Sequence, residues 1–437
     1  MKLRNKVNFI HVLAVFSLLV QLPSFYGEDI VNARTNYLSG DRIDFWGGIS
    51  TIAYAFLPDF GFRWQIWLAI IQISLTTLGL LKTLPIKNLS RKHYLINIAL
   101  AYSALIFGSQ MTRDGLMFSL LLFGYASFKS AAAERKGIKF FIIPIMLICF
   151  GMSFRPWLSI ATIPLVLVLL KIEKRKIGKT LTIVIMIILT LLPLIFEKIA
   201  KESLDLRNSY PEQQVMLMDV AATYCYTTNF MTGMKAETAI KIFSEDPNFS
   251  KNACRLYRPD TWVSLTQAAN ASSRGLEVNF SLIKPGELDK YEELKSNWVN
   301  MIIQDPVSYL QNKILFSSKL VIGSDGRDLS IRSADSPSTI LLAIFRIPYD
   351  IAISLHLYSL LALISFLLIG PLKRRLVKKS EKIELDDFII YLFLGAFIWT
   401  TLSSIAYIGS NGRYTYTFTL LSFLVYSSKN FTLETQS

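Results

Sequence analysis

The residues of this chain best suited to chemistry include arginines placed in short turns between long apolar segments. Arg113 and Asp114 separate two such segments, and Arg155 separates the next two. Arg413, followed by Tyr414, precedes the last apolar segment. Charged groups at the edge of a membrane are costly, so they usually pair or bind a ligand, and guanidinium groups match the oxygens of a phosphate. The three arginines therefore predict a phosphate site; the alternative is an interfacial ion pair between Arg113 and Asp114.

A second group of reactive side chains is acidic and lies in the first polar region, residues 27–63. Asp41 and Asp44 stand three residues apart, so they would share one face if this stretch were helical. A carboxylate held beside arginines can take the proton of an attacking hydroxyl while the arginines stabilise a departing phosphate. The pair therefore predicts a general base or a ligand of a divalent cation, with a solvated loop as the alternative. No other cofactor is indicated.

Several other chemistries find no support in the motifs. The three cysteines and three histidines show none of the spacings that hold zinc or iron–sulfur clusters. The chain also lacks the glycine-rich nucleotide loops and the nucleophile elbow of hydrolases. Cys225 and Cys254 share one polar region and could form a disulfide in an oxidising compartment, whereas Cys149 lies in an apolar segment and should be inert.

The composition indicates that apolar helices must position these groups. Of the 437 residues, 52% are hydrophobic and 18% are charged, against about 25% charged in soluble domains. Apolar segments close to the roughly 20 residues that cross a bilayer recur at 7–26, 64–81, 94–111, 114–128, 139–153, 157–170, 180–196, 351–370, 387–408 and 414–427. The sequence predicts an all-α polytopic membrane protein with about ten transmembrane helices.

The positive charge is distributed unevenly over the connections between these segments. The formal net charge is +14, which could indicate nucleic-acid binding or membrane orientation. About half of the 46 Lys and Arg residues lie at the N-terminus, in alternate short connections and near the C-terminus. This is the positive-inside pattern. It places both termini in the cytoplasm and excludes nucleic acid as a partner.

Three regions follow from this topology. Residues 1–196 form an N-terminal membrane module of about seven helices, with the acidic loop 27–63 outside the cytoplasm. Residues 197–350 form an external domain between the seventh and eighth spans, with an interfacial helix at 338–349. Within it, Pro306 predicts a helix that ends at Asp305 and a second helix that begins at Pro306. Residues 351–437 form a C-terminal membrane module of about three helices.

The whole organisation resembles the polytopic glycosyltransferases with the GT-C fold, and more narrowly the bacterial members that modify or polymerise O-antigen. The residues that carry the resemblance are Asp41 and Asp44 of the first loop, Arg113-Asp114, Arg155-Pro156, Asp219-Val-Ala-Ala, the segment 298–309 (WVNMIIQDPVSY) and Arg413-Tyr414. The resemblance implies that a sugar, with glucose among the candidates, passes from a polyprenyl-phosphate carrier to a surface polysaccharide at the periplasmic face of the inner membrane. It implies Asp41 or Asp44 as the catalytic base, and binding of the carrier phosphate or substrate by the arginines with Asp114 and Tyr414.

The expected partners are the polyprenyl-phosphate-linked sugar donor, the polysaccharide acceptor and membrane lipids. Two other functions fit the same sequence. A polymerase of O-antigen repeat units would share the size and layout, and would transfer a whole repeat unit instead of one sugar. A transporter of polysaccharide or lipid-linked sugar would instead bury charges at mid-membrane and show internal repeats. The sequence shows no repeat and few charges inside its apolar segments.

Overall fold

The fold is taken from a computed structural model. It describes residues 4–21, 25–26, 28–44, 47–59, 64–84, 91–109, 111–134, 137–172, 178–244, 253–257, 282–322 and 332–333, and the single positions 398, 421 and 424. Arg413, Tyr414 and the interfacial helix expected at 338–349 lie outside these residues. The same holds for nearly all of the expected C-terminal module, 351–437.

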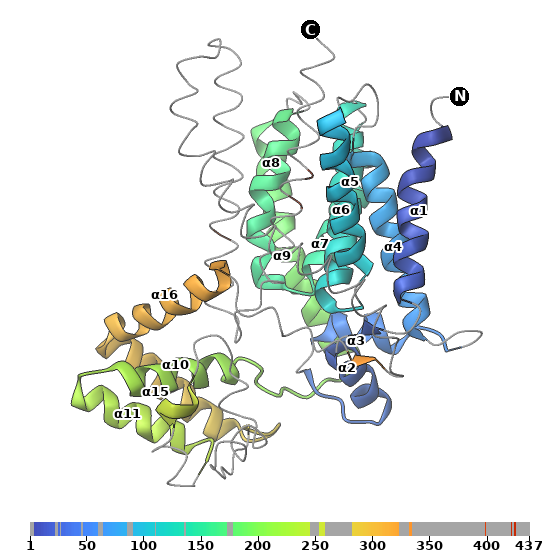
Figure 1. Ribbon diagram of the computed structural model, residues 1–437. Coiled ribbons are helices and arrows are strands. Elements are labelled where there is room, and N and C mark those ends of the chain that lie inside the picture. The colour runs from blue at the N-terminus through green and yellow to red at the C-terminus, as the bar shows by residue number, and fades with distance from the viewer. Residues whose placement is uncertain are drawn as a thin grey trace, which may run out of the picture.

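The described chain is mostly helical, and its longest apolar helices stand side by side in one bundle (Figure 1). The bundle comprises α1 (Arg4–Gln21), α4 (Trp64–Thr83), α5 (Arg91–Ser109), α6 (Arg113–Ala133), α7 (Ile142–Met152), α8 (Thr162–Ile172) and α9 (Lys179–Ser203). Within the described residues, three stretches are long and apolar enough to cross a membrane: Trp64–Thr83, Arg113–Ala133 and Thr180–Ser203. Helices α7 and α8 have 11 residues each, fewer than the roughly 17 that a crossing needs.

Helices α4 and α6 pack closely because small residues face each other. Thr76 and Ser119 share a buried hydrogen bond of 2.9 Å between their hydroxyl oxygens. A Cβ added to Gly79 would lie 2.7 Å from the Leu122 side chain and 3.1 Å from the backbone nitrogen of Phe123. Small residues of this kind let helix backbones approach where both helices are apolar. The two helices run in the same direction, so Arg113 lies at the same end of the bundle as the start of α4.

The first polar region folds into two short helices at this end of the bundle, α2 (Glu28–Leu38) and α3 (Gly48–Ala55). The buried Arg34 guanidinium donates to the backbone carbonyls of Tyr54 (2.6 Å), Ala55 (3.0 Å) and Leu57 (3.0 Å), which lie at the C-terminus of α3 and just after it. It also donates to Asp59 at 2.5 Å. These bonds satisfy carbonyls that the end of a helix leaves without partners, so this region is ordered by Arg34.

A second group of helices has its own hydrophobic core beside the lower end of the bundle (Figure 1). We call it the side domain; it comprises α10 (Gln213–Tyr226), α11 (Phe230–Lys241), residues 253–257, α15 (Leu288–Gln304) and α16 (Pro306–Ile322). The helix break predicted at Asp305 and Pro306 is confirmed. The carboxylate of Asp305 accepts from the backbone nitrogen of Ser308 (3.1 Å), which caps α16.

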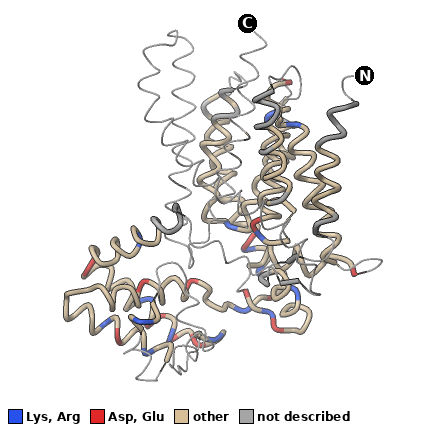
Figure 2. The backbone as a smooth tube through the Cα atoms, in the orientation of Figure 1, with Lys and Arg blue, Asp and Glu red and all other residues tan. Residues whose placement is uncertain are grey.

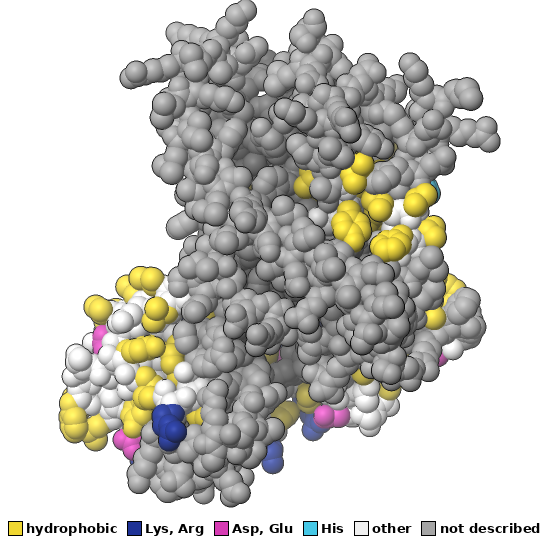
Figure 3. All heavy atoms as spheres, in the orientation of Figure 1, with side chains coloured by type: hydrophobic (Ala, Val, Ile, Leu, Met, Phe, Trp, Pro, Cys, Tyr) yellow, Lys and Arg dark blue, Asp and Glu magenta, His cyan; other side chains and the backbone are white. Residues whose placement is uncertain are grey.

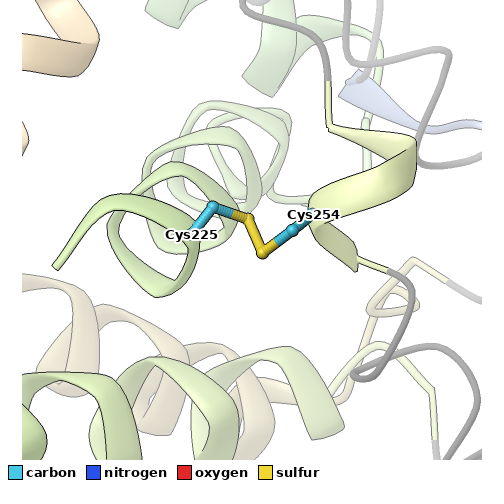
Figure 4. The surroundings of a disulfide bond; sticks show 2 residues. All are labelled: Cys225 and Cys254. Carbon is cyan, nitrogen blue, oxygen red and sulfur yellow. A yellow bond between two sulfur atoms is a disulfide. The ribbon is translucent and has the colours of Figure 1, made fainter.

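A disulfide between Cys225 and Cys254 joins the end of α10 to residues 253–257, with 5.3 Å between the two Cα atoms (Figure 4). These are the two cysteines that the sequence places in one polar region. A link of this kind typically stabilises a domain by about 2–4 kcal/mol. Cys149 is free and buried in α7. Elsewhere, β1 (Phe25–Tyr26) pairs antiparallel with β2 (Arg332–Ser333).

The close approach of α4 and α6 predicts a size limit at Gly79. In Gly79→Ala the new methyl group meets the backbone of Phe123, and overpacking of about 1–3 kcal/mol outweighs the gain in helix propensity of up to about 1 kcal/mol. We expect a lower midpoint of thermal unfolding, measured by fluorescence-detected size exclusion of the detergent-solubilised protein. Gly137→Ala is the control, because nothing lies within 4 Å of a Cβ there. Equal midpoints for the two variants would contradict the packing described.

Candidate functional site

Charged residues gather at the end of the bundle that carries α2 and α3, whereas the middles of α4, α6 and α7 contain none (Figure 2). This end combines residues from four parts of the chain: the first polar region, the start of α6, the turn after α7 and the end of α9. Five of the predicted site residues lie here: Asp41, Asp44, Arg113, Asp114 and Arg155. Together they form the candidate site.

Asp114 and Arg155 form a buried ion pair. Asp114 lies in the first turn of α6, whose N-terminus is capped by the Thr112 hydroxyl accepting from the Gly115 nitrogen at 3.0 Å. Arg155 directly precedes the short 3₁₀ helix Pro156–Ala161, and its Nε and Nη2 atoms each lie 3.3 Å from Asp114 Oδ1. Their side chains are 3% and 7% exposed. Asp114 is thus paired with Arg155, a partner that the sequence analysis did not consider for it.

Asp44 is a buried anchor between the first polar region and the end of α9. Its carboxylate accepts from Lys201 Nζ (3.0 Å), from the Ser209 backbone nitrogen (2.7 Å) and from the Ser209 hydroxyl (2.9 Å). Beside it, Ile43 forms a parallel bridge with Arg207. The stretch from Asp41 to Ile43 is therefore not an α-helix. Asp41 and Asp44 do not share a helix face, which the sequence analysis expected only for a helical stretch. Three donors occupy the Asp44 carboxylate, so it suits a positioning role.

Asp41 differs from Asp44 because it is open to solvent. Its side chain is 53% exposed and accepts from the Arg207 guanidinium at 2.9 Å. Arg207 is itself 61% exposed, and exposed ion pairs of this kind contribute about 0–1 kcal/mol. An accessible carboxylate with a weakly held partner can turn toward a substrate hydroxyl. Of the two aspartates, Asp41 is the one whose carboxylate solvent can reach.

Glu197 is a site residue that the sequence analysis did not find. It lies on α9 and accepts from the backbone nitrogens of Gly48 (2.7 Å) and Ile49 (3.0 Å) at the N-terminus of α3, where a negative charge is favoured. Lys201, one turn later, lies 3.8 Å from it, and the charge of Arg113 also attracts it. Its signal in the sequence was a glutamate four residues before a lysine at the end of the apolar segment 180–196.

Glycines let α3 reach α9. Gly47 has φ +87°, a conformation that other residues rarely adopt, and precedes the helix directly. A Cβ on Gly48 would lie 2.6 Å from the backbone nitrogen of Lys201. The sequence Gly47-Gly48 therefore places the N-terminus of α3 directly against Glu197 and Lys201.

The side domain holds a separate buried polar cluster around Asp219. Its carboxylate accepts from Lys313 Nζ (2.7 Å), Asn312 Nδ2 (2.9 Å) and Trp298 Nε1 (3.1 Å). Burial raises the pKa of the Asp219 carboxyl, and the charge of Lys313 opposes this shift. The cluster joins the Asp219-Val-Ala-Ala segment of α10 to the segment 298–309 and to α16. The Asp219 side chain is 1% exposed and its donors come from two other helices, so the cluster holds α10, α15 and α16 together.

The predicted residues fall into two sets. Asp41, Asp44, Arg113, Asp114 and Arg155 lie at one end of the bundle, whereas Arg413 and Tyr414 are outside the described residues. Across the part of the chain that the structure describes, no group of three or more His, Cys, Asp or Glu side chains could hold a metal ion. No protein-family model, curated protein or solved structure matches this chain. The proposal of a function therefore rests on the residues themselves.

The Asp114–Arg155 pair predicts a large loss of stability when one partner is removed. Arg155→Met leaves the Asp114 charge buried without its guanidinium, which typically costs about 3–5 kcal/mol. The double variant Asp114→Asn/Arg155→Met should be more stable than Arg155→Met, because no uncompensated charge remains. Thermal unfolding of the detergent-solubilised variants measures both.

A surface pair supplies the matched control for this experiment. Lys241 lies 3.0 Å from Glu237, and their side chains are 58% and 40% exposed, so Lys241→Met should change stability by about 0–1 kcal/mol. If Arg155→Met is as mild as Lys241→Met, the buried pair does not hold the turn after α7 to α6.

Proposed function

We propose that this chain is an integral-membrane glycosyltransferase. It transfers a sugar, glucose among the candidates, from a polyprenyl-phosphate carrier to O-antigen or a related surface polysaccharide. One observation supports this most: an exposed carboxylate, Asp41, lies at the same end of an apolar bundle as the cationic groups of Arg113, Arg155 and Lys201. A lipid-linked sugar phosphate presents its phosphate at that depth, with its lipid tail alongside apolar helices.

In this proposal, the end of the bundle with α2 and α3 faces the periplasm of a bacterial inner membrane. Lys82, at the opposite end of α4, and the other basic connections then face the cytoplasm, as the positive-inside pattern requires. About ten spans cross the membrane, with both termini cytoplasmic. The side domain lies in the periplasm between the seventh and eighth spans, where the Cys225–Cys254 disulfide fits an oxidising compartment.

The proposed reaction is a displacement at the anomeric carbon of the sugar. The acceptor hydroxyl oxygen forms a bond to this carbon, its proton passes to Asp41, and the bond from the carbon to the carrier phosphate oxygen breaks. The electron pair of that bond leaves on the phosphate, and Arg113 stabilises the charge that develops there. Arg155 and Asp44 act as positioning residues, because each is already engaged by a buried partner.

The two aspartates should respond differently to the same substitution. Asp41→Asn removes the base with little change in size and should lower the rate of sugar transfer by about 10²–10⁴ with normal abundance in the membrane. Asp44→Asn weakens the bonds to Lys201 and Ser209, so its loss of activity should follow a loss of folded protein. Transfer from a synthetic polyprenyl-phosphate sugar, divided by the amount of protein in the membrane, separates the effects.

Glu202→Gln is the matched control for these two variants. Glu202 is also an acidic residue at this end of α9, but its side chain is 67% exposed and lies 3.7 Å from the exposed Lys198. It should retain full activity and abundance. Full activity per folded molecule in Asp41→Asn would show that Asp41 is not the base.

The product tests the proposed function itself against its alternatives. When the gene is deleted in its host, a transferase that adds one sugar leaves the lipopolysaccharide ladder on a gel intact and changes its reaction with serotype-specific antibodies. Loss of the ladder, restored by the wild-type gene, would indicate a repeat-unit polymerase. Lipid-linked precursor accumulating on the cytoplasmic side would indicate a transporter. If the ladder, the antibody reaction and the amount of lipid-linked precursor are all unchanged, the proposal is contradicted.

A further inference from the structure

Helix α16 of the side domain carries polar side chains on the face that packs against the domain and apolar side chains on the exposed face. Its inward face is polar over the first two turns, where Ser308 and Asn312 are buried and the Lys313 side chain, 12% exposed, reaches Asp219. Phe316, further along the helix, is also buried. Its outward face is mostly apolar, with Val307, Leu310 and Ile314 on adjacent turns and the exposed Gln311 among them. A helix on a water-soluble domain normally shows the reverse pattern. The buried polar side chains of Ser308 and Asn312 form hydrogen bonds with Asp305 and Asp219. The polar inward face is therefore satisfied within the domain.

The apolar side chains of this face are extensively exposed. Val307 is 71% exposed, Leu310 55% and Ile314 66%, and Ile303 at the end of α15 adds a fourth at 71%. Positions 307, 310 and 314 follow the spacing of one helix face. We call these four residues the α16 apolar face. Figure 3 shows hydrophobic side chains along the upper part of the side domain, over this helix. An apolar strip of this kind marks a surface that is covered by something other than water.

The position of α16 indicates what covers it. Among the helices of the side domain, α16 lies on the side toward the bundle and runs across the direction of the bundle helices (Figure 1). Its C-terminal end points toward the lower end of the bundle, and the sequence reaches its next apolar segment, 351–370, fewer than 30 residues after Ile322. A helix that lies across the spans, at their end and with its apolar side outward, has the geometry of an interfacial helix.

We propose that the α16 apolar face rests on the outer surface of the bilayer that the bundle crosses. Val307, Leu310 and Ile314 enter the boundary between headgroups and acyl chains, while Lys313 and Asn312 hold the helix to Asp219 on the domain side. The side domain is thereby fixed against the membrane beside the charged end of the bundle. The inference rests on the membrane assignment of the proposed function, but not on sugar transfer.

The test measures the distance of single positions from lipid in the full-length protein. Cysteines are introduced at Leu310 and Ile314 in a Cys149→Ala background, with the Cys225–Cys254 disulfide intact, and are labelled with a small fluorophore. The protein is placed in nanodiscs whose lipids carry bromine on their acyl chains. Because an interfacial helix inserts only about 5–10 Å, both labels should lose roughly half of their fluorescence relative to unbrominated lipid.

Two further positions make the outcome unambiguous. A label at Lys295 on α15, an exposed position of the same domain, should be unaffected by bromine. A label at Ile187 on α9, whose side chain is exposed on the bundle, should be quenched strongly. Quenching at 187 without quenching at 310 and 314 would overturn the inference and leave the membrane assignment standing. Absence of quenching at 187 would overturn the membrane assignment and the inference together.

Discussion

The arrangement of the charged end depends on Lys201, which lies between two carboxylates from different parts of the fold. Its ammonium group is 3.0 Å from Asp44 and 3.8 Å from Glu197. Asp44 fixes the first polar region to the residues after α9, and Glu197 fixes the N-terminus of α3. Charges withdrawn from water are tolerated only with partners. The mutual satisfaction of these groups is therefore what holds α3 against the bundle.

The same constraint appears twice more, with different consequences. Asp114 and Arg155 neutralise each other between α6 and the turn after α7. Asp219 gathers Lys313, Asn312 and Trp298 inside the side domain. The second case accounts for the polar residues on the inward face of α16, because Asn312 and Lys313 are the partners of Asp219 there.

These contacts also divide the roles of residues that are chemically alike. Asp41 and Asp44 have the same carboxylate and are three residues apart, yet one is more than half exposed and the other receives three hydrogen bonds. A base needs access to its substrate, whereas an anchor needs to be covered. In the proposed transferase, the exposed Asp41 is therefore the base and the buried Asp44 is a positioning residue.

The sequence by itself determined the helical class, the apolar segments of α4, α6 and α9 and the break at Pro306, because each depends on residues close together along the chain. It also identified Cys225 and Cys254 as the two cysteines that could form a disulfide, because the third cysteine lies in an apolar segment. Only the tertiary structure decided the partners of the charges. Asp114 meets Arg155 across 41 residues, Glu197 meets Gly48 across 149, and Lys201 meets Asp44 across 157. No local pattern encodes such distant meetings, since they depend on how complete helices pack.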